Sequence, residues 1–201
     1  TLGYFARPWK GDLEVALGKP GKKDYTVYKA YRMLSLTNEM GKDQEYLGVR
    51  RFNWRAENQG WIHPSQSGFR SGRSVDMAVG GVVAPVEHAI SRRRAVLLMV
   101  FDVEGAFNKS WHPALLEGLA QRGCPPGLFC QVASFLRDRK CVLVINGYSA
   151  SKELTRGFPQ GVIWSTSLWN IQKDRVLHHL DDIAEQLIRC RAAMRRMRQW
   201  G

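Results

Sequence analysis

The chain has 201 residues, of which 44% are hydrophobic and 24% charged, so it is long enough and apolar enough to fold around a core. Its formal net charge of +12 at pH 7 favours a polyanionic partner, although a basic but indifferent surface would give the same value. The composition excludes a chain that is disordered throughout, and no apolar stretch approaches the roughly 20 residues that a membrane-spanning helix needs.

The four cysteines show no paired spacing and no zinc-ligand spacing; they are Cys124, Cys130, Cys141 and Cys190. No signal-peptide pattern opens the chain, and its start at Thr1 leaves open that it is a fragment of something longer. We therefore expect an intracellular protein, nuclear or cytoplasmic, with free thiols in a reducing compartment.

The first thirty residues are rich in glycine and lysine and predict irregular structure, with a strand at 13–17 followed by the basic turn GKPGKK. Residues 38–60 predict a helix, which Gly48 weakens, and HPSQSGFRSGRS (63–74) predicts a loop. Residues 75–91 predict a second helix, strained by internal glycine and proline.

The apolar run AVLLMVF (95–101) has the length and the polar bounds of a strand buried on both faces, and Asp102 stands at its exit. A carboxylate in that position can face a functional site, or it can simply cap the following turn. Helices are predicted next over 113–123 and 127–137, and a strand over 141–146.

Gly147 predicts a turn from that strand to a partner strand near 152–155. RGFPQG (156–161) predicts a loop that leads into a helix from about Ser165. Apolar residues at spacings of three and four then predict one continuous amphipathic helix with arginines on its outer face: Val176, Leu180, Ile183, Leu187, Cys190, Met194 and Met197.

Four stretches, in this order, resemble the reverse-transcriptase domain of non-LTR retrotransposons: KPGKKDYTVYKAYRMLSL (19–36), HPSQSGFRSGRSVDMAV (63–79), VFDVEGAFNKSWHPALL (100–116) and RGFPQGVIWSTSLWNI (156–171). The resemblance implies an α+β fold, a partial right-hand polymerase with fingers and palm but no thumb. A small antiparallel palm sheet, from strands near 97–103 and 141–155, would be packed by helices on one face.

The same resemblance divides the chain into three parts. A fingers-like region with basic loops would cover 1–92 and a palm-like region 93–171. An amphipathic basic helix would cover 172–201, and the palm hairpin of the family is not recognisable.

The family is an RNA-directed DNA polymerase that transfers nucleotides with two Mg²⁺ ions held by carboxylates. By resemblance, Asp102 is the catalytic and metal-binding aspartate, with the backbone carbonyl of Val103 beside it. The second metal element, an apolar strand with a Tyr-x-Asp-Asp turn, is missing. Its candidates are Asp181 and Asp182, which the helical period places mostly on a polar side; a short deletion is the interpretation we favour over a displaced, working pair.

Further roles follow from the resemblance alone. Arg32 matches a residue that contacts the incoming triphosphate, Phe107 one that packs under the sugar, and Gln160 with Gly161 a loop that lines the nucleotide pocket. The alternatives are a surface arginine, a core aromatic and an ordinary Pro-Gly turn. The expected contacts to nucleic acid are Lys22, Lys23, Arg70 and Arg73.

Three hypotheses remain: an active polymerase domain, a polymerase-derived relic that binds nucleic acid without chemistry, and a structural component of a ribonucleoprotein. Because Asp102 lacks the neighbours needed to hold two ions, we expect little or no polymerisation from this copy. The expected partners are RNA and DNA as template-primer, and no membrane.

Overall fold

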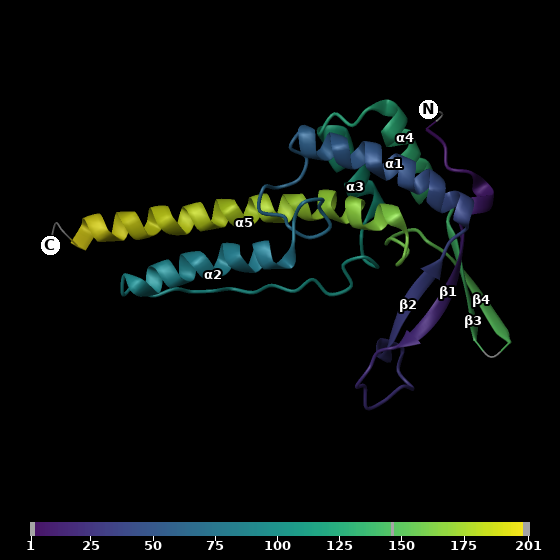
Figure 1. Ribbon diagram of the computed structural model, residues 1–201, viewed down its shortest axis with the longest axis horizontal. Helices are drawn as coiled ribbons and strands as arrows, with labels where there is room; N and C mark the ends of the chain where they lie inside the picture. Colours follow the sequence, from purple (N-terminus) through teal and green to yellow (C-terminus); the bar gives the residue numbers. More distant parts are fainter. Residues whose placement is uncertain (1–2, 146, 199–201) are drawn as a thin grey trace.

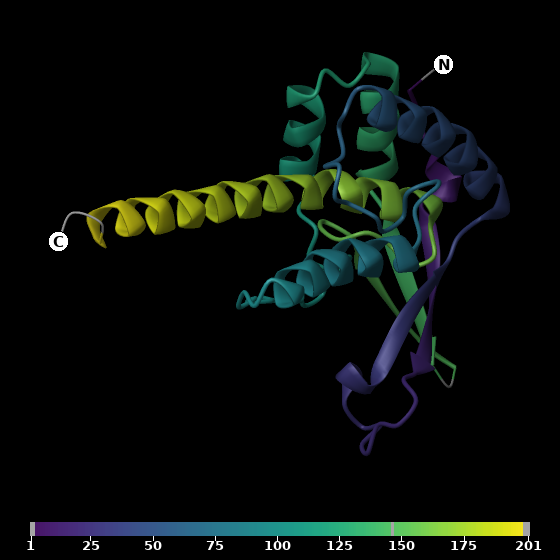
Figure 2. The ribbon, with the colours of Figure 1, turned by 60° about the vertical axis from the view of Figure 1, so that its left-hand side comes forward.

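The computed structural model describes residues 3–145 and 147–198, with side chains as far as residue 186. Within these residues, a four-stranded sheet and five α-helices form an α+β fold (Figure 1). Four of the helices gather into a body. The sheet projects from one end of that body, and the distal part of α5 (Ile163–Arg198) leaves it in another direction (Figure 2).

The sheet has the strand order β2-β1-β3-β4. β1 (Gly11–Gly18) pairs antiparallel with β2 (Tyr31–Leu36) and parallel with β3 (Lys140–Ile145), which turns into the antiparallel β4 (Tyr148–Glu153). The prediction of a purely antiparallel sheet is therefore wrong, because the sheet is mixed. The strands predicted at 13–17, at 141–146 and near 152–155 correspond to β1, β3 and β4, whereas β2 was not predicted.

The predicted buried strand at 95–101 is also absent. Residues 95–103 belong to no strand and all are exposed, and the exposed fraction of the large apolar residues runs from 44% at Val96 to 85% at Val100. Their backbone groups make no hydrogen bond to the backbone of any residue that the structure describes. The apolar run has the composition of a strand, but a strand also needs a neighbour, and the four strands pair elsewhere. We call residues 95–103 the extended segment.

The helical body consists of α1 (Glu39–Asn58), α3 (His112–Gln121), α4 (Pro126–Leu136) and the first half of α5. All four lie close to their predicted ranges, and α5 is one continuous helix as predicted; the apolar positions from Leu187 onward lie outside the described side chains. The body encloses a core of fully buried large side chains, among them Phe52, Leu115, Phe135, Trp164 and Leu168. Two short 3₁₀ turns, η1 (Arg7–Trp9) and η2 (Tyr28–Ala30), precede β1 and β2.

Gly48 has a packing role that sequence reasoning missed. A Cβ atom at this position of α1 would lie 2.7 Å from Cζ2 of Trp164 and 2.7 Å from Nε2 of Gln131. Because real Cβ atoms do not approach so closely, the glycine lets α1 pack directly against α4 and α5. The residue that weakens the helix in isolation therefore permits the body to close.

A buried ion pair joins the sheet to the body. Arg139 donates from Nη2 to both carboxylate oxygens of Asp12 at 2.6 and 2.8 Å, and its guanidinium lies over the rings of Phe5 and Phe135. Burial raises the pKa of Asp12, and the neighbouring Arg139 opposes this rise. Both partners are almost fully buried, so removing either one would leave an uncompensated charge.

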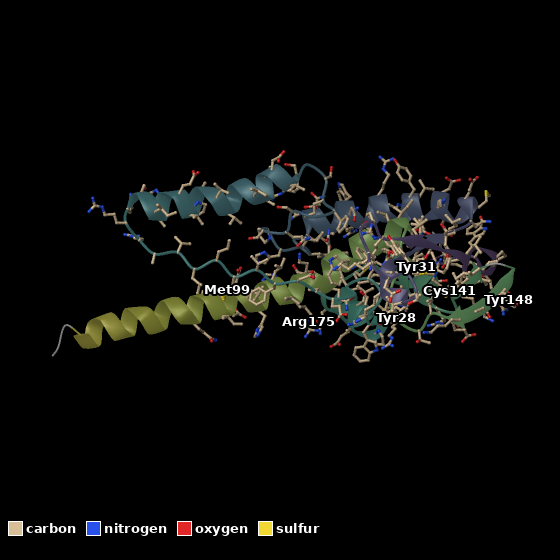
Figure 3. The ribbon with its side chains drawn as sticks, turned by 90° about the horizontal axis from the view of Figure 1, so that it is seen from below. Tyr28, Tyr31, Met99, Cys141, Tyr148 and Arg175 are labelled. Carbon is tan, nitrogen blue, oxygen red and sulfur yellow. The ribbon has the colours of Figure 1, made fainter. Side chains whose placement is uncertain are left out.

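The remaining helix, α2 (Val75–Ser91), has the predicted bounds and no buried residue. It runs in the same direction as the distal part of α5, and the extended segment returns beside α2 in the opposite direction (Figures 1 and 3). No helix in the described part of the chain combines the length and apolarity needed to cross a membrane. The thiols of Cys124, Cys130 and Cys141 are free, as predicted, and burial raises the pKa of Cys124 to about 11.

Candidate nucleotide and nucleic-acid site

The loop before α5 contacts a distant segment of the chain through its backbone. The N–H of Gly157 donates to the carbonyl of Ser110 at 2.6 Å, and the N–H of Phe158 to the carbonyl of Phe107 at 2.8 Å. Gly157 has a φ of 81°, and a Cβ there would lie 2.6 Å from the carbonyl oxygen of Asn108. Only glycine allows this approach, so the glycine of RGFPQG fixes the loop to the segment that follows Asp102.

Gln160 and Gly161 lie against the outer edge of β2. The carbonyl of Gln160 accepts from the N–H of Ser35 at 2.7 Å, and its Nε2 donates to Oδ1 of Asn108 at 3.2 Å. A Cβ at Gly161 would lie 3.2 Å from Cδ1 of Leu34. The loop therefore bridges the first half of the sheet and the segment after Asp102.

Arg32 is exposed on the same face of β2 as Leu34, because residues two apart on a strand share a face. The two lie about 7 Å apart along the strand. The structure thus brings Arg32, the Gln160–Gly161 loop and Asn108 to one edge of the sheet, which we call the nucleotide edge. Three segments that the sequence analysis treated separately converge there.

Phe107 is half-buried beside this edge. Its ring centroid lies 6.1 Å from that of Phe69 and 5.7 Å from that of Trp169, and it packs against the hydrophobic core. This is the packing of a core aromatic, which the sequence analysis held as the alternative. Contact with a sugar stays a prediction.

Asp102 lies in the extended segment and is exposed, with Val103 beside it. Neither side chain makes a hydrogen bond or ion pair with a described residue. The strand that was expected to fix the position of the carboxylate does not form.

The other two aspartates belong to a different neighbourhood. Asp181 lies on α5 with its Oδ2 2.8 Å from Nε2 of His63, and Asp182 is exposed on the same helix. Among the residues that the structure describes, no group of three His, Cys, Asp or Glu side chains could hold a metal ion. The carboxylates present therefore do not fit a pair of Mg²⁺ ions, which need several oxygen ligands around one position.

A buried network around Asp174 was missed by sequence reasoning. Its carboxylate accepts from the N–H of His63 at 2.6 Å and pairs with the guanidinium of Arg122, and Nε2 of His178 lies 3.7 Å away. The spacing of these residues in the sequence could have predicted the network, because positions 174, 178 and 181 share one face of a helix. This network attaches the loop at 63–74 to α5.

Arg70 is already bonded within the chain. Its Nε donates to Glu57 at 2.8 Å, its Nη2 pairs with the same carboxylate, and its Nη1 donates to the carbonyls of His63 and Gln66 at 3.0 Å each. The hydrogen bonds between Arg70 and Glu57 raise the pKa of Arg70 and lower that of Glu57. The structure gives Arg70 a role in shaping its loop, whereas Arg73 is exposed.

Lys22 and Lys23 lie exposed in the connection between β1 and β2, and neither forms an ion pair with a described residue. They are therefore available to a polyanion, as the sequence analysis expected, while the contact itself stays a prediction.

The mixed α+β fold is compatible with the fingers and part of the palm of a polymerase. Residues 19–191 match the family model described as reverse transcriptase (RNA-dependent DNA polymerase). The chain belongs to the reverse-transcriptase family and is a domain of the non-LTR retrotransposon kind, as predicted from the four motifs.

Two relatives are from Drosophila melanogaster. The RNA-directed DNA polymerase from mobile element jockey is 31% identical over 171 residues, which is 85% of this chain and 18% of the relative. The putative 115 kDa protein in type-1 retrotransposable element R1DM is 34% identical over 181 residues, 89% of this chain and 17% of the relative. The chain therefore spans less than a fifth of the length of these relatives.

Proposed function

We propose that this chain is the fingers and part of the palm of an RNA-directed DNA polymerase, and that it binds RNA and DNA as template and primer. The observation that carries the proposal is the convergence of Arg32, the Gln160–Gly161 loop and Asn108 at the nucleotide edge. A basic arginine beside a glycine loop is suited to a nucleoside triphosphate, because the loop brings backbone close to the ligand and the guanidinium pairs with phosphate. The net charge of +12 supports the polyanionic partners.

We further propose that this copy performs little or no polymerisation on its own. Two metal ions about 3.5–4 Å apart require several carboxylate oxygens at one place. Asp102 stands alone in solvent, and Asp181 is engaged with His63. Loss of one group that stabilises the transition state electrostatically commonly lowers the rate by ~10²–10³. Here more than one of the carboxylates that would accompany Asp102 is missing.

Primer extension tests this proposal. Purified chain, Mg²⁺, a primed RNA template and all four deoxynucleotides should give no product above the level of the Asp102→Asn variant. Extension that Asp102→Asn abolishes would contradict the inactivity, and the family membership would be unaffected.

Binding is tested separately. Affinity for a primed RNA template should fall steeply with salt, because each phosphate that a lysine or arginine neutralises releases counterions. Lys22→Ala with Lys23→Ala should reduce the salt slope, and Arg51→Ala, which removes an exposed arginine on α1, is the control. Binding that does not depend on salt would count against the nucleic-acid partner.

A second candidate is a structural component of a ribonucleoprotein. The exposed apolar surface of α2 and the extended segment favours it, because surfaces of this kind mark protein contacts. Association with a protein partner that does not weaken with salt would support this function over template binding.

A further inference from the structure

The face of the sheet opposite Arg32 carries a hollow of about 680 Å³. Neighbouring residues on a strand point to opposite faces, so Tyr31 and Met33 lie on one face of β2 and Arg32 on the other. Tyr31 pairs with Gly18 and Met33 with Ala16, which places the hollow over β1 and β2. It is therefore separate from the nucleotide edge.

Tyrosines form the wall of this hollow, and apolar side chains such as Ala16, Met33 and Leu143 form its floor. Glu14 also lines the hollow, and its carboxylate accepts from the hydroxyl of Ser35 at 2.6 Å. The hydroxyl of Tyr25 donates to the carbonyl of Lys19 at 2.7 Å, and the hydroxyl of Tyr31 donates to the carbonyl of Tyr25 at 2.9 Å. The two rings meet edge to face at 6.1 Å. The wall is held by these bonds before any ligand arrives, so little ordering cost remains for binding.

Two further tyrosines extend the wall into solvent. Tyr28 lines the rim and is 81% exposed, and Tyr148 is 83% exposed. Tyr148 pairs with Ile145, another lining residue, and so lies on the same face (Figure 3). We call Tyr25, Tyr28, Tyr31 and Tyr148 the tyrosine face.

Lysines surround it. The connection between β1 and β2, which supplies Tyr25 and Tyr28, also carries four lysines that form no ion pair with a described residue: Lys19, Lys22, Lys23 and Lys29. The carboxylate of Asp24, in the same connection, accepts from the N–H and the hydroxyl of Thr26. The rim is therefore positively charged while the wall is aromatic.

We propose that the tyrosine face binds single-stranded nucleic acid, with unpaired bases stacked on Tyr28 and Tyr31 and phosphates beside the lysines. Aromatic rings interleaved with unpaired basic residues are the surface that single strands recognise, because every base offers a face for stacking. A duplex keeps its bases stacked inside and cannot use such rings. The inference rests on the proposed function and adds a strand-binding surface on the opposite face from the nucleotide edge.

The test compares affinities of the purified chain for a labelled RNA of about 12 nucleotides and for the matching duplex, by fluorescence anisotropy across a salt series. Tyr28→Ala should weaken single-strand binding by about five- to a hundredfold and leave duplex binding unchanged. Its salt slope should equal that of the parent, because no charge is removed. Tyr28→Phe should bind like the parent, since the ring remains.

The matched control is Tyr46→Ala, an exposed tyrosine on α1, which should leave both affinities unchanged. Equal single-strand affinity in Tyr28→Ala and the parent would overturn the inference and spare the proposed function. Failure of the parent to bind any nucleic acid would overturn both. If Tyr28→Ala changed the mass of the particle in light scattering but not the RNA affinity, the tyrosine face would be a protein contact, and the inference would again be wrong.

Discussion

At the scale of single residues, two glycines with the same φ angle differ in their surroundings. Gly147 and Gly157 both have a φ of 81°, but a Cβ at Gly147 would meet nothing within 4 Å, whereas one at Gly157 would meet the carbonyl of Asn108. Gly147→Ala should therefore cost ~1–3 kcal/mol of unfolding free energy, the cost of the left-handed conformation alone. Gly157→Ala should cost clearly more, because the loop must also separate from Asn108. Urea unfolding of both variants measures the difference, and equal losses would contradict the proposed anchoring of the loop.

Glu45 illustrates how a buried carboxylate ties two helices together. It lies in α1, and one of its oxygens accepts from the N–H groups of Ile163 and Trp164 at the start of α5. Glu45→Gln keeps an acceptor for these groups, whereas Glu45→Ala leaves them buried without one. We expect Glu45→Ala to lose ~1–3 kcal/mol of unfolding free energy relative to Glu45→Gln, measured by urea unfolding.

The pH dependence of the same residue has a defined sign. Burial raises the pKa of Glu45 above its usual value of 4.5, and the hydrogen bonds from Trp164 and Ile163 partly oppose this. Between the two pKa values, the folded chain holds a proton on Glu45 that the unfolded chain has released. The contribution of Glu45 to the free energy of unfolding is therefore full below about pH 4.5, and it is lost as pH rises through the raised pKa. The parent should lose stability over that range relative to Glu45→Gln. Glu39→Gln, exposed in the first turn of α1, should follow the parent.

Sequence reasoning at this scale found residue types but not their partners. It selected Arg70 as a contact for nucleic acid from its motif, and nothing local indicated that Glu57 and two carbonyls would occupy the guanidinium. It selected Gln160 and Gly161 correctly as a loop, yet their contact with Ser35 joins residues far apart in the chain. Such contacts depend on the packing of whole elements, which no spacing of residues records.

At the scale of elements, Gly48 in α1 and Gly80 in α2 should respond to alanine in opposite ways. Glycine inside a helix costs ~0.5–1 kcal/mol relative to alanine, and Gly80 in α2 has open space around it, so Gly80→Ala should stabilise by about that amount. Gly48→Ala gains the same propensity but drives a Cβ into the ring of Trp164, a buried core residue. It should therefore destabilise. Thermal unfolding of the two variants tests this, and a stabilised Gly48→Ala would show that the contact between α1 and α5 relaxes freely.

The helices were predictable, whereas the sheet was predicted only in part, for a physical reason. Strands form near the predicted 13–17, 141–146 and 152–155, but β2 was not predicted and the predicted strand at 95–101 is absent. A helix satisfies its own backbone, so periodicity and end signals suffice to place α1 and α4. A strand depends on a neighbour supplied by distant sequence. The run at 95–101 has every local property of a buried strand and forms none, while β2 pairs with β1 despite its polar positions.

At the scale of the whole molecule, the apolar surface of α2 and the extended segment predicts self-association. Leu97, Val100 and Phe101 are each more than two-thirds exposed, and their backbone groups form no hydrogen bond with the backbone of a described residue. A long apolar segment with free backbone groups is a template for pairing with another chain. We expect the parent to elute as an oligomer or aggregate in size-exclusion chromatography with light scattering at moderate salt.

The Leu97→Lys and Val100→Lys double variant should shift the parent toward monomer, and Leu47→Lys, which changes an exposed leucine on α1, should not. Salt separates this association from nucleic-acid binding. Two copies of a chain with net charge +12 repel each other, so added salt should strengthen an apolar contact between them. The same salt should weaken binding to phosphates, because it reduces the gain from counterion release. A monomeric parent at all salt concentrations would show that the extended segment is covered within its own chain in solution.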